Sequence, residues 1–261
     1  MKSEPISSNE RNVSIDILRG FALIGIFLVN MPSCHSPIFL DQSPEYIGFD
    51  QWLDVFFQMF IQTKFYTIFS FLFGLGFYIF MSRAEQKDLN VKSLFSRRLL
   101  ILLLIGAVHL ILMWYGDILH TYAITGFLLL LFYKRKVITI LIWAFSLLFL
   151  FYSIIYAQFS IPDKELEEIM QNIALENKQQ LVQYTEMYQE GGYIDWVVYR
   201  FDLEIVPQFA HLPLVMMPVL AMFLFGLAAG KIGIFHPSPS NRLIIRKIWL
   251  ISFMLGLPLS I

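Results

Sequence analysis

The sequence predicts an all-α fold, a polytopic transmembrane helical bundle of about seven spans with a helical loop on the extracytoplasmic side. Three observations support this prediction. Hydrophobic residues make up 57% of the 261 residues and charged residues only 15%, which is outside the range of soluble domains. The apolar residues gather in runs of roughly 17 to 25 residues, the length that a bilayer crossing requires. Most of the 19 lysines and arginines lie in alternate connecting segments, as expected for a multi-pass protein.

Apolar runs divide the chain into membrane and aqueous parts. A polar segment (1–14) precedes a transmembrane bundle (15–160), and after an acidic loop the last spans occupy 212–261. The polar lead with acidic residues predicts an uncleaved anchor and not a removable signal peptide. The last run is too short for a span where the sequence stops at Ile261, so we expect that the natural chain continues beyond it. The predicted spans are 17–32, 65–81, 99–114, 118–133, 137–159 and 212–234, followed by the unfinished run from Ile248.

The distribution of positive charge predicts that the N-terminus is cytoplasmic. Lys and Arg next to spans are retained on the cytoplasmic side of a membrane. If the N-terminus is cytoplasmic, most of the Lys and Arg residues lie on the cytoplasmic side of the membrane, and the acidic loop 161–211 lies on the opposite side. The predicted cytoplasmic positions are Lys2, Arg11, Arg19, Arg83, Lys87, Lys92, Arg97, Arg98, Lys134, Arg135, Lys136, Lys231, Arg242, Arg246 and Lys247.

An amphipathic helix is predicted between the first two spans. Asp50, Asp54, Gln58 and Gln62 recur every four residues among aromatic residues, so a helix over 50–63 carries one polar stripe. Such a helix can lie at the outer interface of the membrane. Alternatively, it lengthens the second span, which then tilts.

The acidic loop 161–211 is also predicted to fold. Asp163 follows a proline in the order that starts a helix, and apolar residues come after it at helical spacing. Gly191 and Gly192 then interrupt the pattern, before a short second helix over 193–199 that returns to the membrane. The acidic side chains either guard an external cleft or keep an exposed helix soluble.

Ionisable side chains within spans are costly, so each needs a partner or a function. On the first span, Asp16 and Arg19 share one helical face, and Asn30 returns to nearly the same face further along. This face either lines a substrate cavity or ends in an interfacial ion pair while Arg19 extends to the membrane surface. Lys64, at the outer start of the second span, can bind an anionic substrate group or neutralise an aspartate such as Asp117.

Small residues at a spacing of four predict surfaces for close helix packing. Ser70 and Gly74 form such a pair on the second predicted span, and Gly226 and Gly230 form another on the span at 212–234. The second pair also offers a surface through which a homo-oligomer can form.

The densest group of polar residues surrounds the predicted turn between the third and fourth spans. His109 lies near the outer end of the third span, Gly116 and Asp117 make the turn, and His120 follows on the next helix. A carboxylate beside an imidazole selects its tautomer and stabilises the imidazolium, which makes the pair a general base. His109 is therefore the candidate catalytic base, Asp117 its orienting partner and His120 a candidate substrate-binding residue. Alternatively, the pair relays protons in a transporter, or His109 is a structural residue.

Several classes of function lack their sequence signals. The five histidines show no metal-ligand spacing, and a single cysteine, Cys34, excludes a disulfide framework. Cys34 also has no activating pattern beyond the adjacent His35, and neighbouring residues seldom have the geometry of a catalytic pair. No basic domain offers a surface for nucleic acid. We therefore predict no metal site, no bound cofactor and no nucleic-acid partner.

Four motifs occur along the chain in the order RNVSIDILRGFALIGIFLVN, KFYTIFSFLFGLGF, GAVHLILMWYGDILHTYAITG and MFLFGLAAGKIGIF. Together they resemble the YeiB-like bacterial membrane proteins. The resemblance implies a multi-pass protein of the bacterial plasma membrane, a further C-terminal domain of spans and a role described as transport. His120 is not part of the family pattern. The residues that match it are Arg11, Asp16, Arg19, Gly20, Asn30, Lys64, Phe65, His109, Gly116, Asp117 and Tyr122.

The first motif is also similar to the opening span of transmembrane acyltransferases, including heparan-alpha-glucosaminide N-acetyltransferase, which pass an acyl group from a cytoplasmic thioester to an acceptor outside. This similarity implies an acyl-thioester co-substrate such as acetyl-CoA and a small-molecule or glycan acceptor. His109 would then be the base, Lys64 or Asn30 would hold the carbonyl or the acceptor, and Asp16 with Arg19 would border the donor entrance. The alternatives are a transporter or export component for a small solute, and a scaffold protein whose acidic loop binds a partner.

Reporter fusions test the predicted topology. A fusion after Tyr133 and a fusion after Lys178 should lie on opposite sides of the membrane, because one apolar run separates these positions. Alkaline phosphatase, which is active only outside the cytoplasm, should be active at Lys178 and inactive at Tyr133. Activity at both positions, or at neither, would contradict the layout.

Overall fold

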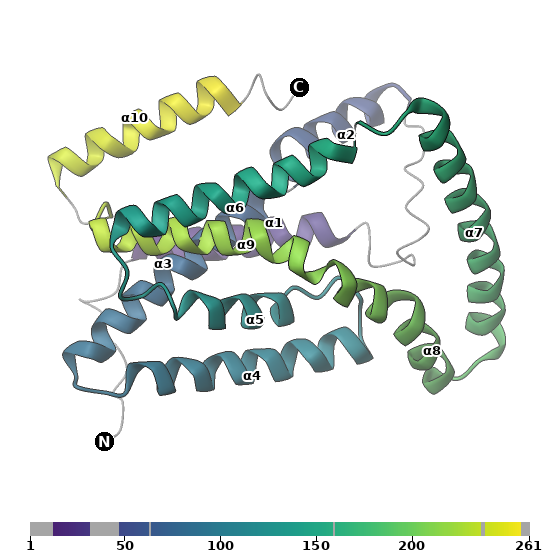
Figure 1. Cartoon of the computed structure of the whole chain (residues 1–261), viewed down its shortest axis with the longest axis horizontal. Coiled ribbons are helices and arrows are strands. Elements are labelled where there is room, and N and C mark those ends of the chain that lie inside the picture. Colours follow the sequence, from purple (N-terminus) through teal and green to yellow (C-terminus); the bar gives the residue numbers. More distant parts are fainter. Residues whose placement is uncertain (1–12, 32–46, 63, 159, 236–237, 257–261) are drawn as a thin grey trace.

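The computed structural model describes residues 13–31, 47–62, 64–158, 160–235 and 238–256. All regular secondary structure in these ranges is helical, which confirms the predicted all-α fold class. In Figure 1 the chain runs from left to right along α4 and α6 and in the opposite direction along α9. In chain order the elements are α1 (Val13–Asn30), α2 (Phe49–Phe60), α3 (Lys64–Gln86), α4 (Val91–Leu112), α5 (Leu119–Leu129), α6 (Val137–Gln158), α7 (Asp163–Glu190), α8 (Tyr193–Arg200), a π-helical turn (Phe201–Ile205), α9 (Val206–Ile232) and α10 (Pro239–Gly256).

The predicted number of about seven spans is not confirmed. The fourth predicted span, 118–133, forms only the shorter apolar helix α5. Its 11 residues make a helix about 16 Å long, roughly half the thickness of the hydrocarbon core. In the described ranges, five segments are long and apolar enough to cross a membrane: Val13–Asn30, Phe49–Gln86, Val91–Leu112, Val137–Ala157 and Tyr193–Ile232.

The outward surfaces of the long helices are apolar. Only 11% of the candidate span in α6 is buried within the protein, and large side chains such as Phe149, 77% exposed, point outward. On α4, Leu104 is 66% exposed. Apolar surface of this extent on several adjoining helices is suited to lipid and not to water. These surfaces support a membrane protein, whereas the cytoplasmic N-terminus stays a prediction.

The core forms where α3, α5 and α9 meet, with α1 packed along α3, α4 along α5 and α6 along α9. Phe73 of α3 stacks on Phe223 of α9, their ring centroids 4.4 Å apart. Tyr122 of α5 meets Phe223 edge-on at 5.1 Å, and its hydroxyl lies 2.6 Å from the hydroxyl of Ser70 on α3. One buried tyrosine therefore joins all three helices, and its hydroxyl is satisfied without water, as a lipid-facing bundle requires.

The small residues are the contact surface between α3 and α9. A β-carbon on Gly74 would overlap the carbonyl oxygen of Phe223, and one on Gly226 would overlap the carbonyl oxygen of Phe71. The predicted packing faces are therefore confirmed. Gly226 and Gly230 are both buried against α3 within one chain, and the homo-oligomer stays a prediction.

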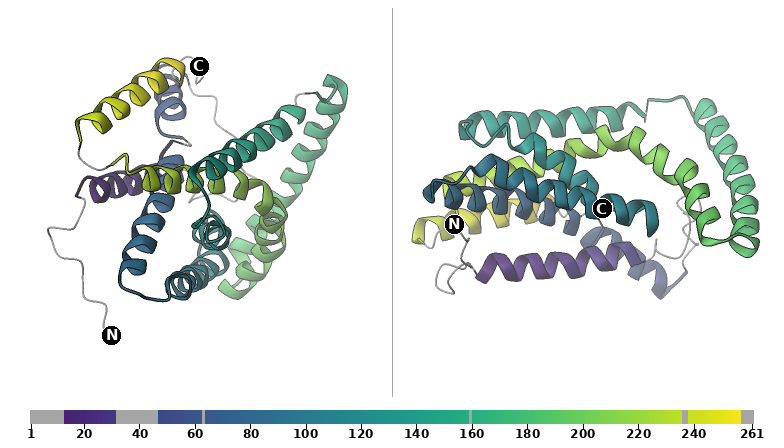
Figure 2. Two further views of the ribbon diagram at one scale, coloured as in Figure 1. Left: turned by 60° about the vertical axis from the view of Figure 1, so that its left-hand side comes forward. Right: turned by 90° about the horizontal axis from the view of Figure 1, so that it is seen from below.

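The two segments predicted to be helical on the outer side are helices. None of the residues of α2 is buried; its location at the membrane interface stays a prediction. Helix α7 has 28 residues and runs across the end of the bundle, seen in Figure 1 and in the view from below in Figure 2. The chain breaks at Gly191 and Gly192, and α8 then continues through the π-helical turn into α9. The helix that returns to the membrane thus begins with α8, well before residue 212.

Replacing Gly226 by Val tests the contact between α3 and α9. The added methyl groups would force the two backbones apart, so we expect the free energy of unfolding to fall by about 2 kcal/mol or more. Thermal unfolding of the purified protein in detergent measures this loss. The matched control is Gly20→Val on α1, where a β-carbon meets nothing within 4 Å; equal melting temperatures for the two variants would contradict the packing.

Candidate functional site

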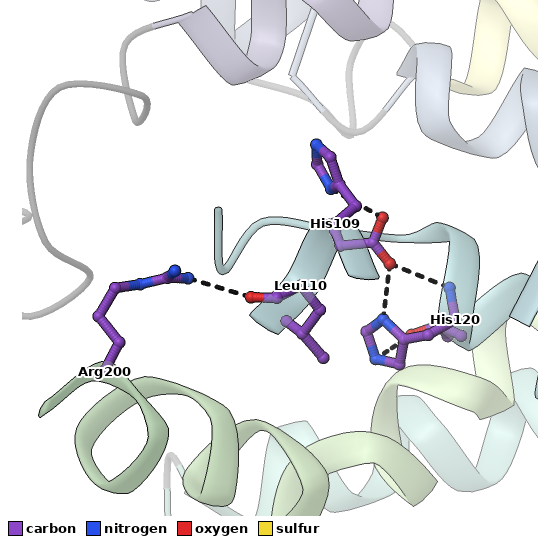
Figure 3. Close-up of polar contacts among 6 residues, drawn as sticks. His109, Leu110, His120 and Arg200 are labelled. Carbon is purple, nitrogen blue, oxygen red and sulfur yellow. Dashed lines mark hydrogen bonds and ion pairs between the residues drawn. The ribbon is translucent and has the colours of Figure 1, made fainter. Parts of the chain in front are cut away.

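The turn between α4 and α5 brings His109, Asp117 and His120 together (Figure 3). The close approach of the two helices depends on Gly106, where a β-carbon would overlap the backbone nitrogen of His120. Asp117 precedes α5, and its carboxylate accepts a hydrogen bond from the backbone N–H of His120 at 3.0 Å. The carboxylate thereby satisfies one of the free N–H groups in the first turn of α5.

Asp117 is shared by two imidazoles. Its Oδ1 lies 3.0 Å from Nδ1 of His109, and its Oδ2 lies 2.8 Å from Nδ1 of His120. Because an ionised carboxylate only accepts hydrogen bonds, each Nδ1 is the donor. The Nε2 atoms of the neutral rings are then left as acceptors, and that of His120 receives the hydroxyl of Thr121 at 3.2 Å.

The two histidines differ in exposure. The side chain of His109 is 34% exposed, whereas those of Asp117 and His120 are 1% and 3% exposed. His120 packs against the ring of Phe209 on α9, with centroids 5.9 Å apart. Only His109 can therefore present Nε2 to a molecule that approaches the protein surface. His120 binds the buried oxygen of the Asp117 carboxylate.

The surroundings of Asp117 favour its ionised form. Burial by itself raises the pKa of the carboxyl group, but the hydrogen bonds from the ring and backbone of His120 and from the backbone of Leu119 lower it and outweigh the effect of burial. The pKa of Asp117 is therefore lowered from its ordinary value of 3.8. A charged carboxylate at neutral pH is what an orienting partner of a general base must be.

The other predicted site residues make contacts away from this cluster. Arg19 pairs with Asp16 at 3.5 Å on α1, and its guanidinium lies over Gly76 of α3. Asn30 lies at the end of α1. Lys64 donates from Nζ to the carbonyl oxygen of Gln58 at 3.2 Å. In the described ranges, the side-chain hydrogen bonds of Asp117 come from the two histidines and not from Lys64.

A second charged group lies at this end of the bundle and was not among the predicted site residues: Arg200, which falls within the acidic segment 161–211. Nε of Arg200 donates to Oε2 of Glu204 at 2.5 Å, and both side chains are buried. Arg200 also donates to carbonyl oxygens at the C-terminal end of α4, including that of Leu110 at 3.2 Å (Figure 3). The spacing of four residues between Arg200 and Glu204 was the available signal, since it pairs charges on a helix.

In the parts of the chain that the structure describes, no group of three or more His, Cys, Asp or Glu side chains is arranged so that it could hold a metal ion. The cluster consists of two imidazoles on one carboxylate, and each imidazole donates to it. An imidazole that donates Nδ1–H to a carboxylate keeps a lone pair on Nε2, which can accept a proton.

The chain is similar to bacterial proteins that carry no assigned function. It is 35% identical over 271 residues to the uncharacterized protein YxaH of Bacillus subtilis, an alignment that covers 97% of this chain and 66% of YxaH. It is 40% identical over 159 residues to an uncharacterized 39.9 kDa protein in the amylase 3'region of Bacillus acidopullulyticus, covering 61% of this chain and 44% of that protein. The uncharacterized protein YeiB of Escherichia coli is 35% identical over 121 residues, covering 45% of this chain and 30% of YeiB.

The chain thus spans no more than about two thirds of the length of these relatives, since the share is 66% for YxaH and smaller for the other two. No protein-family model and no solved structure matches the chain.

Acid titration of stability tests the charge on Asp117. Because folding lowers the pKa of this carboxyl from 3.8, its contribution is present above that value and is lost as the pH falls through the lower folded pKa. Asp117→Asn should cost about 2 kcal/mol or more at neutral pH and flatten the decline in melting temperature below pH ~4. Asp50→Asn on the exposed helix α2 is the control. If the melting temperature of Asp117→Asn declined at low pH as steeply as that of the wild-type protein, this would contradict an ionised Asp117.

Proposed function

We propose that this chain, which belongs to the YeiB-like protein family together with YxaH, transfers an acyl group from a cytoplasmic thioester to an extracytoplasmic acceptor. One observation carries the proposal. His109 holds a buried carboxylate through Nδ1 and keeps its ring partly exposed. This is the geometry of a general base that acts on a hydroxyl or an amine.

The chemistry needs one proton acceptor and one orienting group. As the acceptor oxygen or nitrogen attacks the thioester carbonyl, Nε2 of His109 takes its proton, and the carboxylate of Asp117 stabilises the resulting imidazolium. The C–S bond then breaks, and the departing thiolate receives the proton. His120 cannot replace His109 in this role, because its side chain is 3% exposed and its Nε2 is occupied by Thr121.

The residues on α1 and at the start of α3 have supporting roles in this proposal. Asp16 and Arg19 border the cytoplasmic entrance for an anionic donor such as acetyl-CoA. Asn30 or Lys64 helps to hold the reacting carbonyl or the acceptor at the outer side. Lys64 already donates to the carbonyl oxygen of Gln58, so an anionic acceptor would have to compete with that hydrogen bond.

A second candidate is a transporter or export component that couples solute movement to protons. It is favoured by the polar groups that continue inward from the cluster on α5. His120 accepts from Thr121, and the hydroxyl of Thr125, which is completely buried, has no hydrogen-bond partner in the described structure. A water molecule at Thr125 would extend a proton path toward the cytoplasm.

The variant His109→Ala separates the two candidates. Loss of a general base should lower the rate of acyl transfer by about 10² to 10⁴-fold, with membrane insertion unchanged. Profiling of envelope components in cells with and without the protein identifies the acylated product, and transfer from radiolabelled acetyl-CoA in membrane vesicles then measures the rate.

The matched control is His211→Ala, because His211 is an exposed histidine of α9 whose Nδ1 donates to the carbonyl oxygen of Pro207 in the same helix. A wild-type transfer rate in His109→Ala ends the assignment of the base. A solute flux that collapses with the proton gradient, without any acylated product, favours the transporter.

A further inference from the structure

The outer end of α4 is held by side chains from α8. The last carbonyl groups of a helix have no partner within the helix. Here Arg200 donates to the carbonyl oxygens of Leu110 at 3.2 Å and Ile111 at 3.4 Å. Tyr193, at the start of α8, donates its hydroxyl to the carbonyl oxygen of Leu112 at 2.5 Å. Three consecutive carbonyl groups are thus capped by two residues of a distant helix.

Every nitrogen of the Arg200 guanidinium has a partner. Nε binds Glu204, and the two terminal nitrogens bind the carbonyl groups of α4. The ring of Trp196 covers the guanidinium at 4.4 Å. The side chain of Arg200 is 2% exposed and that of Glu204 is 5% exposed. Three hydrogen bonds from three nitrogens of one planar fork are specific to arginine, since lysine offers a single nitrogen.

A buried ion pair is an expensive way to cap a helix. The desolvation of two charges offsets most of their attraction, and a glycine after the helix would satisfy the same carbonyl groups at lower cost. The guanidinium also lies at the negative end of the α4 dipole, which contributes a further favourable interaction. The arrangement therefore fixes the position of the helix end and contributes little to the free energy of unfolding.

The capped turn is the one that carries the base. His109 directly precedes Leu110, and its own carbonyl oxygen accepts from the backbone N–H groups of Met113 and Trp114. We propose that Arg200 is a positioning residue: by holding Leu110 and Ile111, it fixes the last turn of α4 so that Nδ1 of His109 meets Asp117. This inference rests on the proposed function in taking His109 as the base.

Neighbouring residues extend the connection to the acidic helix α7. Tyr199, next to Arg200, donates its hydroxyl to the carbonyl oxygen of Gln180 on α7 at 3.1 Å. Its ring also lies 6.2 Å from that of Tyr184. Adjacent residues of α8 thus join α7 on one side and the helix of His109 on the other.

The tautomer of His109 is the spectroscopic signature of this positioning. Asp117 selects the form protonated on Nδ1, so a displaced helix end should raise the ratio of the Nε2–H to the Nδ1–H form, about tenfold for the loss of one charged hydrogen bond. Nitrogen-15 NMR of histidine-labelled full-length protein in lipid vesicles measures the ratio. The His109 signals are assigned by their loss in His109→Gln.

Three variants and one control make the test. The double variant Arg200→Met with Glu204→Gln removes both charges, so it leaves no uncompensated charge that could prevent folding. The double variant should raise the ratio of the Nε2–H to the Nδ1–H form of His109 about tenfold. Arg200→Lys should raise this ratio less, and Tyr193→Phe should raise it slightly. Tyr188→Phe, on an exposed tyrosine of α7, should leave it unchanged. A wild-type ratio in both the double variant and Tyr193→Phe would overturn the inference.

The result is distinguishable from a failure of the proposed function. If the ratio changes but His109→Ala transfers acyl groups at the wild-type rate, the positioning stands and the catalytic assignment fails. If the ratio stays at its wild-type value while His109→Ala abolishes transfer, the catalytic assignment stands and Arg200 has no positioning role.

Discussion

The site depends on a single buried carboxylate that joins two helices. Asp117 lies in the turn between α4 and α5 and accepts hydrogen bonds from His109, from the ring of His120 and from the backbone of His120. Because both imidazoles direct Nδ1 at one carboxylate, the direction of each ring is fixed. One Nε2 faces an accessible surface and the other faces the protein interior. The close packing at Gly106 is what allows this geometry.

The medium around the helices explains why this constraint matters. In lipid, a polar group without a partner is costly, so buried charges mark positions with a function. The charged side chains that are buried in the described ranges are Asp117, Arg200 and Glu204. Asp117 binds His109, and Arg200 binds the carbonyl groups that follow His109 in the chain. The buried charges of the described residues are therefore concentrated at the C-terminal end of α4.

The sequence predicts the parts of this structure that arise from local patterns. Apolar run length located the candidate spans, and the spacing of three between Asp16 and Arg19 predicted a pair that the structure contains. The turn at Asp117 made its contact with His109 predictable, because only eight residues separate the two. The length of α5 was not predictable, since an apolar run does not show where a helix ends.

The role of Arg200 could not be predicted for a different reason. Its partners on α4 are 89 and 90 residues away in the chain, and no periodicity in the sequence encodes a contact over that distance. The sequence showed Arg200 only as one of few positive charges in an acidic loop. The contact between the ring of His120 and Asp117 is an observation of the structure, and substrate binding by His120 stays a prediction.

The way in which α4 is held also bears on the choice between an enzyme and a transporter. Alternating access requires elements that move past each other around a substrate site. The helix of His109 is instead tied to α8 at three consecutive carbonyl groups and to α5 through Asp117. Movement of α4 would break these hydrogen bonds together and leave the guanidinium of Arg200 without its partners on α4. A fixed base beside an exposed surface is the preorganised arrangement that catalysis favours, so the way in which α4 is held fits the proposed enzyme better than the proposed transporter.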